Sequence, residues 1–117
     1  MSRSGADRLR DILDAIDRTQ RALTGMTFDE FRDQDILHAA LCHYVLIISE
    51  ASRHVSDQQK ADHAHIRWRQ IADIGNLIRH AYFRVDPERL WNIYLDEMPL
   101  LRSVVVQMLR DQSSDSD

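Results

Sequence analysis

The sequence has few of the residues that interrupt helices. Only three glycines and two prolines occur in 117 residues, and no stretch alternates apolar and polar residues as a half-buried strand does. The single cysteine, Cys42, cannot form an internal disulfide, and its apolar surroundings in the sequence indicate a buried thiol. No apolar run approaches the roughly eighteen residues of a membrane span, and the N-terminus lacks the apolar core of a signal peptide. We therefore expect a cytoplasmic, all-helical protein with no membrane contact.

Lysine is also nearly absent, because fourteen of the fifteen basic residues are arginine. The net charge of −4 argues against binding a phosphate backbone as a property of the whole protein. Between residues 67 and 89, however, five arginines face three acidic residues. Arginine suits bidentate phosphate contacts, although a solvated helix face explains any single one of these arginines about as well. The local excess of arginine makes this region a candidate for an anion site.

Apolar residues recur at helical spacing in four long segments, which predicts helices over residues 7–23, 34–55, 66–85 and 87–110. Ser4 with Asp7, and Thr27 with Glu30, match the capping-box pattern at helix starts. Gly25 is suited to the left-handed conformation that follows a helix end. We therefore expect a first helix that ends before Gly25 and a short turn of helix after Thr27.

The connections are predicted to be short. Residues 56–62 are polar and form the best candidate loop, and Asp86-Pro87 is typical of a helix start. Pro99 falls inside the last helix and should kink it or split it in two. We predict a single domain over residues 1–110, an antiparallel four- to five-helix up-and-down bundle of the all-α class, followed by an acidic disordered tail over residues 111–117.

The stretch from Asp73 to Arg84 concentrates the polar side chains that carry chemistry. Asn76 and His80 are four residues apart and lie one above the other on a helix, and Arg79 borders the same face. Tyr82 follows within half a turn. An imidazole can transfer a proton near neutral pH, an arginine can hold a phosphate, and an amide can position a substrate. These groups are what metal-independent RNA cleavage requires, although a histidine beside an arginine on a helix is more often structural.

Two further residues are secondary candidates at this site. Arg84 is a possible phosphate ligand, and Glu50, which would be costly if it were buried unpaired, is expected to meet one of the arginines. His63 and His65 form a His-x-His pair that could ligate a metal, but no further ligand lies at a suitable spacing. We therefore predict no metal site and no cofactor.

The chain resembles the HepT-type HEPN toxins, the ribonuclease half of the HEPN/MNT toxin–antitoxin systems. The resemblance extends over nearly the whole chain and is carried by Arg8-Leu9-Arg10-Asp11-Ile12-Leu13, Ile48-Ser49-Glu50-Ala51, Trp68-Arg69-Gln70-Ile71, Asn76-x-x-x-His80-x-Tyr82, Val85-Asp86, Leu90-Trp91 and Met98-Pro99-Leu100-Leu101.

The family pattern at the site is Arg-Asn, three residues, His, one residue and Tyr. This sequence matches it at Asn76, His80 and Tyr82, but Gly75 stands at the position of the arginine. Arg79, one helical turn later, could reach the same phosphate position. A glycine inside a helix costs about 1 kcal/mol relative to alanine, so its small size is expected to admit a partner helix or substrate backbone.

The resemblance implies a toxin of a type VII-like pair, a metal-independent endoribonuclease that acts on tRNA or mRNA. It implies His80, Arg79 and Asn76 as catalytic residues, with His80 as the general base. It also implies a homodimer that places two His80-bearing helices at a cleft. A minimal nucleotidyltransferase antitoxin would silence the toxin, and it can adenylylate the motif tyrosine, here Tyr82, so that the added nucleotide blocks the cleft.

Two other interpretations remain open. The chain could be a catalytically weak or inactive HEPN subunit that binds a nucleotidyltransferase and a nucleotide or RNA, as Gly75 in place of arginine would suggest. Alternatively, it could be a structural bundle whose polar patch is only a dimer seam. Toxicity on expression without the partner would exclude a passive subunit.

Overall fold

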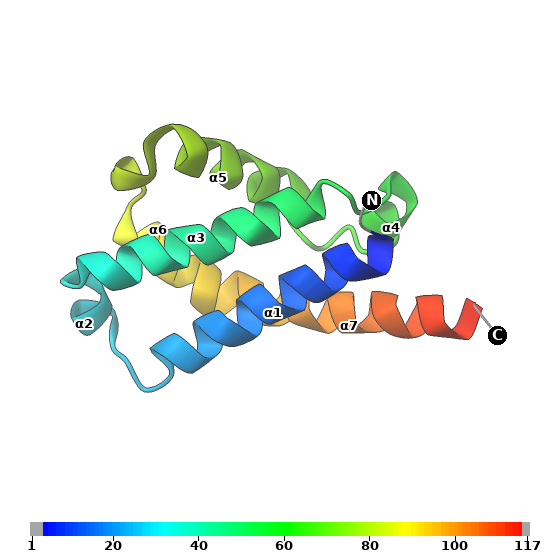
Figure 1. Cartoon of the computed structure of the whole chain (residues 1–117), viewed down its shortest axis with the longest axis horizontal. Helices are drawn as coiled ribbons and strands as arrows, with labels where there is room; N and C mark the ends of the chain where they lie inside the picture. Colours follow the sequence, from blue (N-terminus) through cyan, green and yellow to red (C-terminus); the bar gives the residue numbers. More distant parts are fainter. Residues whose placement is uncertain (1–3, 116–117) are drawn as a thin grey trace.

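The computed structural model describes residues 4–115, and within this range every regular element is helical, which confirms the all-α prediction. Four long helices carry the architecture, and short helical segments connect them (Figure 1). The elements are α1 (Gly5–Leu23), α2 (Phe28–Arg32), α3 (Asp35–Ser52), α4 (Asp57–Asp62), α5 (Trp68–Ala81), η1 (Tyr82–Arg84), α6 (Pro87–Asn92), η2 (Ile93–Glu97) and α7 (Met98–Asp115).

The long helices run alternately in opposite directions, as Figure 1 shows for α1, α3, α5 and α7. α3 lies at the centre, because it packs against α1 on one side and α5 on the other, while α7 packs against α1. Apolar side chains from all four helices meet in one core, whose fully buried members include Leu9, Ile12, Ile16, Val105 and Met108. The predicted up-and-down bundle is therefore the observed architecture, with α5 at its edge.

Local sequence signals fix where the first helices begin and end. The Ser4 hydroxyl accepts a hydrogen bond from the Asp7 amide, and the Asp7 carboxylate accepts one from the Ser4 amide. Thr27 and Glu30 make the same reciprocal pair before α2. Gly25 has a φ of 81°, the left-handed conformation that a residue without Cβ adopts freely. Both capping boxes and the glycine turn were predicted from the sequence.

The loop predicted over residues 56–62 is wrong, because Asp57–Asp62 forms α4. The Ser56 hydroxyl accepts a hydrogen bond from the Gln59 amide, and the Gln59 side chain accepts one from the Ser56 amide. Ser-x-x-Gln is itself a capping box, and it starts a helix in a segment without buried residues. The polar composition hid this signal.

The C-terminal part is split, as predicted from Pro99. α6 leads into a turn of π-helix, η2, and α7 begins at Met98, so that Pro99 occupies its second position. The helix continues beyond the start of the predicted disordered tail at residue 111 and reaches Asp115, while residues 116–117 lie outside the described range. The Gln107 side chain donates a hydrogen bond to Asp111 one turn later, which supports that extension. In the part of the chain described here, no helix is long and apolar enough to cross a membrane.

Candidate active site

At Gly75, α5 lies directly against Ser49 of α3. A Cβ atom built on Gly75 would lie 1.9 Å from Ser49 Oγ and 2.6 Å from Ser49 Cβ, which are separations that real Cβ atoms do not tolerate. The predicted need for a small residue is therefore met by a partner helix. The same contact leaves an arginine at position 75 no room for its Cβ in this arrangement of the two helices.

A polar cluster bridges α3 and α5 beside this contact. Arg79 Nη1 lies 2.8 Å from Glu50 Oε1, and Arg79 Nη2 donates a hydrogen bond to Asn76 Oδ1. Arg53 Nη2 donates to the same Asn76 oxygen at 2.9 Å and to the Ala72 carbonyl at 3.4 Å. Two guanidinium groups therefore converge on one amide oxygen. We refer to Glu50, Arg53, Asn76 and Arg79 as the α3–α5 cluster.

The cluster is a plausible anion site because its charges do not cancel. Arg53 and Arg79 supply two positive charges against the single negative charge of Glu50. The Arg79 and Glu50 side chains are 41% and 44% exposed, and an ion pair this accessible to water contributes at most about 1 kcal/mol. Two guanidinium groups that donate to one oxygen, with only one carboxylate beside them, are a chemistry suited to an anion such as phosphate.

His80 and Tyr82 lie at the exposed C-terminal end of α5. The His80 side chain is exposed and makes no hydrogen bond or ion pair with any residue in the range 4–115, and Tyr82 is 54% exposed at the start of η1. The structure thus joins Asn76 to Arg79, whereas the side chain of His80, which directly follows Arg79 and lies one turn after Asn76, makes no hydrogen bond or ion pair with either of them. The roles assigned to these residues in catalysis stay predictions.

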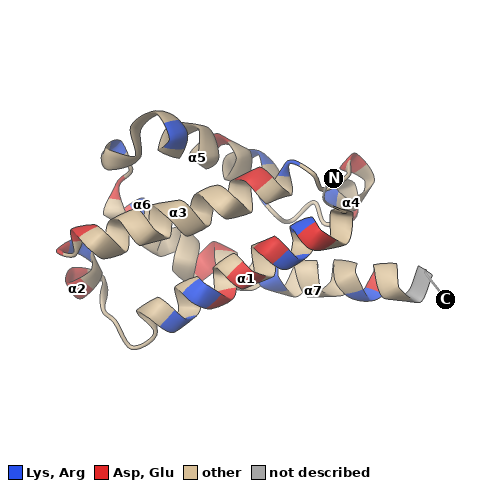
Figure 2. Cartoon of the chain, in the orientation of Figure 1, with Lys and Arg blue, Asp and Glu red and all other residues tan. Residues whose placement is uncertain are grey.

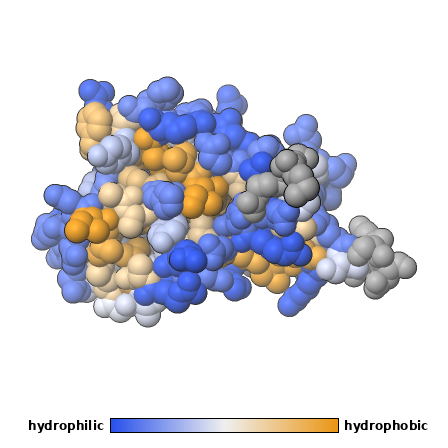
Figure 3. Space-filling view, in the orientation of Figure 1, coloured by the Kyte–Doolittle hydropathy of each residue, from blue (hydrophilic) through white to orange (hydrophobic). Residues whose placement is uncertain are grey.

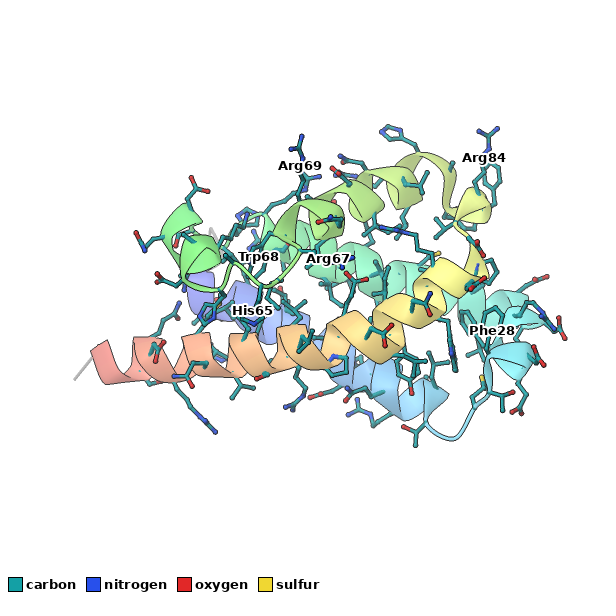
Figure 4. All side chains as sticks on the ribbon, turned by 180° about the vertical axis from the view of Figure 1, so that it is seen from behind. Phe28, His65, Arg67, Trp68, Arg69 and Arg84 are labelled. Atoms are coloured by element: carbon teal, nitrogen blue, oxygen red, sulfur yellow. The ribbon has the colours of Figure 1, made fainter. Side chains whose placement is uncertain are left out.

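The arginines of residues 67–89 do not form one patch. Figure 4 shows Arg67 and Arg69 at the start of α5 and Arg84 at its far end, where Arg84 points away from the body of the protein. The Arg84 guanidinium lies 5.8 Å from the centre of the Phe83 ring. Figure 2 shows basic and acidic positions along α5 and an acidic position on the adjoining part of α3. Among the arginines of residues 67–89, only Arg79 makes a hydrogen bond or ion pair with Glu50 or Asn76 within the described chain.

Sequence reasoning missed Arg53 but correctly expected an arginine partner for Glu50. Arg53 follows Glu50 by three residues at the end of α3, which places both on one helix face, and that spacing is the signal that could have identified it. Glu50 meets an arginine, Arg79, as expected. Both residues make contacts with residues more than twenty positions later in the chain, Asn76 for Arg53 and Arg79 for Glu50.

The opposite side of α5 borders an apolar cavity of about 80 Å³ rather than a close helix contact. Its walls come from α3, the segment before α5, the start of α5, α6, η2 and α7. They are mostly apolar, with Ile48, Ile71, Ile74, Ile93, Met98 and Leu101 among them, and also include polar side chains such as Gln70 and Glu97. Apolar side chains also reach the surface over α3 and α5, between hydrophilic borders (Figure 3). One side of α5 is therefore tightly packed and polar, whereas the other is loosely packed and apolar.

The remaining reactive residues do not form a second centre. Burial raises the pKa of the Cys42 thiol to about 11, so the sulfur stays protonated and is a poor nucleophile. The rings of His63 and His65 lie 6.2 Å apart, and among residues 4–115 no group of three potential ligands could hold a metal ion.

Comparison with known proteins points in the same direction as the motif. The sequence model of the family described as "Ribonuclease HepT-like" matches residues 12–108. "Probable ribonuclease HepT" of Thermococcus cleftensis is 32% identical over 102 residues, which cover 87% of this chain and 93% of that protein. "Putative RNase TTE0752" of Caldanaerobacter subterraneus subsp. tengcongensis is 26% identical, with 89% and 93% covered. "Putative RNase MJ1380" of Methanocaldococcus jannaschii is 25% identical, with 83% and 89% covered. No solved structure matches.

Proposed function

The chain belongs to the HepT-like ribonuclease family, and on that premise we propose that it is a toxin that cleaves tRNA or mRNA without a metal ion. The observation that carries the proposal is the α3–α5 cluster, where Arg79 and Arg53 converge on Asn76. Within this cluster, Arg79 directly precedes the exposed His80 and Asn76 lies one helical turn before it. It supplies the phosphate-binding charge that the glycine at position 75 cannot provide.

In the proposed reaction, His80 acts as the general base. Its imidazole takes the proton of a ribose 2′-hydroxyl, the 2′-oxygen attacks the adjacent phosphorus, and the bond from phosphorus to the 5′-oxygen of the next nucleotide breaks. The products are a 2′,3′-cyclic phosphate and a 5′-hydroxyl. Arg79 leaves Glu50 and donates to a non-bridging phosphate oxygen, where it stabilises the charge that builds up in the transition state. The Asn76 amide orients the same phosphate.

The leaving 5′-oxygen needs a proton, and we assign that proton to a second copy of His80. A homodimer that places two His80-bearing ends of α5 at one cleft would supply a base from one subunit and an acid from the other. The exposure of His80 and of Leu77, which is 42% exposed on the same helix, is compatible with such a cleft.

We further propose that a minimal nucleotidyltransferase acts as the antitoxin and adenylylates Tyr82. The phenol oxygen would attack the α-phosphate of ATP, lose its proton and release pyrophosphate. Tyr82 is 54% exposed, so a transferase can reach its hydroxyl. The added AMP, two residues from His80, would repel RNA phosphates and occupy the cleft.

The test uses the full chain purified without partner and incubated with tRNA and mRNA in EDTA. Cleavage by the wild type, with products that end in a cyclic phosphate, is expected to fall by about a hundredfold or more in His80→Ala, the range typical of losing a general base. His43→Ala, an exposed histidine on α3, is the matched control and should cleave normally. Cleavage unaffected by His80→Ala would refute the proposal.

A second candidate function is a subunit that binds a nucleotidyltransferase and RNA without cutting it. The glycine at position 75 favours it, because the side chain that the family pattern places there is missing. Expression without the partner separates the two candidates. Growth arrest that depends on His80 supports the ribonuclease, whereas unimpaired growth and an RNA complex that remains intact support the binding subunit.

A further inference from the structure

A second feature of the surface lies beside η1, just beyond His80. It is a groove between the segment from Tyr82 to Val85 on one side and the junction of α2 and α3 on the other. The residues that line it are Arg32, Asp35, His38, Ala39, Tyr82, Phe83, Val85 and Pro87. None of the residues of the α3–α5 cluster lines this groove.

One wall of the groove carries two exposed aromatic rings. Phe83 is 70% exposed and Tyr82 is 54% exposed, and their ring centres are 6.0 Å apart in an edge-to-face arrangement. The Arg84 guanidinium lies 5.8 Å from the Phe83 ring centre and leaves that ring beside a positive charge. Exposed aromatic rings with a neighbouring arginine are the surface on which proteins stack unpaired bases.

The opposite wall offers an acceptor. Asp35 is exposed in the first turn of α3, and no residue in the described chain donates a side-chain hydrogen bond to its carboxylate. Arg32, next to it, pairs with Asp29 at 3.2 Å and Asp33 at 3.6 Å. A free carboxylate can accept a hydrogen bond from the exocyclic amino group of cytosine, adenine or guanine, a group that uracil lacks.

His38 holds the two walls together. Its Nε2 lies 2.8 Å from the Val85 carbonyl oxygen, and its Nδ1 lies 3.9 Å from Cys42 Sγ. A carbonyl can only accept, so His38 carries a hydrogen on Nε2 and donates it to Val85. The buried Cys42 thiol remains protonated and can donate to Nδ1. The backbone that follows Tyr82 and Phe83 is thus anchored to α3, and the aromatic wall is fixed in place.

We propose that this groove binds the base of the nucleotide next to the scissile phosphate of single-stranded RNA. The base stacks on Phe83, and the Asp35 carboxylate accepts a hydrogen bond from its amino group. The inference rests on the proposed ribonuclease function. The groove lies close to the proposed general base, because His80 and Phe83 are three residues apart and their Cα atoms can therefore be at most about 11 Å apart. The groove therefore gives the enzyme a preference for cytosine, adenine or guanine over uracil at that position.

The experiment measures the binding of labelled single-stranded oligocytidylate and oligouridylate to full-length His80→Ala, in which we expect cleavage to be strongly reduced. Phe83→Leu in this background is expected to weaken oligocytidylate binding by about tenfold to a hundredfold, the range for losing one stacked base. Phe83→Trp should preserve binding, because it keeps a stacking surface. Leu95→Ala removes another exposed apolar side chain, on η2 and outside the groove, and should change nothing. Asp35→Asn should reduce the preference for oligocytidylate over oligouridylate.

Several results would overturn the inference. The first is that His80→Ala binds neither oligonucleotide. The second is that Phe83→Leu binds oligocytidylate as tightly as its parent. The third is that Phe83→Leu changes only the molecular mass of the protein assembly in solution, which would make the groove an interface between protein copies. The two proposals fail separately. RNA cleavage by the wild type that is indifferent to Phe83→Leu removes the groove but keeps the ribonuclease. Binding that depends on Phe83, in a protein that never cleaves, keeps the groove and removes the ribonuclease.

Discussion

The two sides of α5 differ in how closely they are packed. Toward α3, Gly75 brings the helix against Ser49, and the α3–α5 cluster forms beside that contact. Toward η2 and α7, the same helix borders an apolar cavity that includes Ile71 and Ile93. We infer that the contact with α3 fixes the positions of the groups proposed for catalysis, whereas the cavity side tolerates substitutions of its apolar side chains.

The largest effect on folding is expected on the close side. Gly75→Ala should destabilise the protein by about 1–3 kcal/mol, because the added Cβ would overlap Ser49 and the helices must move apart. Helix propensity alone would give the opposite sign, a gain of about 1 kcal/mol. Denaturant unfolding measures the difference.

Ser49→Gly provides the matched control for that substitution. Since it removes both atoms that the new Cβ would meet, it should make Gly75→Ala less costly when the two changes are combined. Equal costs of Gly75→Ala in both backgrounds would show that the two residues are not coupled.

A moderate effect on RNA binding is expected from a substitution in the α3–α5 cluster. Arg53→Ala should raise the KM for RNA about fivefold and leave unfolding nearly unchanged, because Arg53 is exposed and its loss removes one charged hydrogen bond to the site. The measurement is cleavage rate against RNA concentration at two salt concentrations, where the difference should shrink at high salt. A lower kcat with an unchanged KM would assign Arg53 a different role.

The smallest effect on the free energy of unfolding is expected for substitutions on the cavity side of α5. Ile71→Met replaces one apolar side chain by another of similar volume at the wall of the cavity, and should cost less than about 1 kcal/mol. RNA cleavage should be unchanged. If this substitution proved as costly as Gly75→Ala, the contrast between the two sides of α5 would be false.

The sequence predicted the parts of this fold that depend on neighbouring residues. The capping boxes at Ser4 and Thr27, the turn at Gly25 and the split near Pro99 each follow from a few adjacent positions. The helix after Ser56 also depends on adjacent residues, since Ser56 and Gln59 form a capping box, but the polar composition of the segment led to the prediction of a loop.

The candidate site was only partly predictable because its contacts join distant residues. Helical spacing placed Asn76 and Arg79 together, and the structure bears this out. Spacing within α5 could not reveal that Arg53 reaches Asn76 from α3, or that Ser49 is the neighbour that requires glycine at position 75. These contacts depend on how α3 and α5 pack.

The central claim is that Arg79 takes the role of the arginine absent at position 75. Its most direct test is the rate of RNA cleavage in EDTA by the wild type, Arg79→Ala and Arg79→Lys, with Glu50→Gln as the control that removes only the partner of the ion pair. We predict that Arg79→Ala lowers kcat/KM by about a hundredfold, that Arg79→Lys retains part of the activity, and that Glu50→Gln cleaves at least as well as the wild type. Equal cleavage by Arg79→Ala and the wild type would contradict the claim.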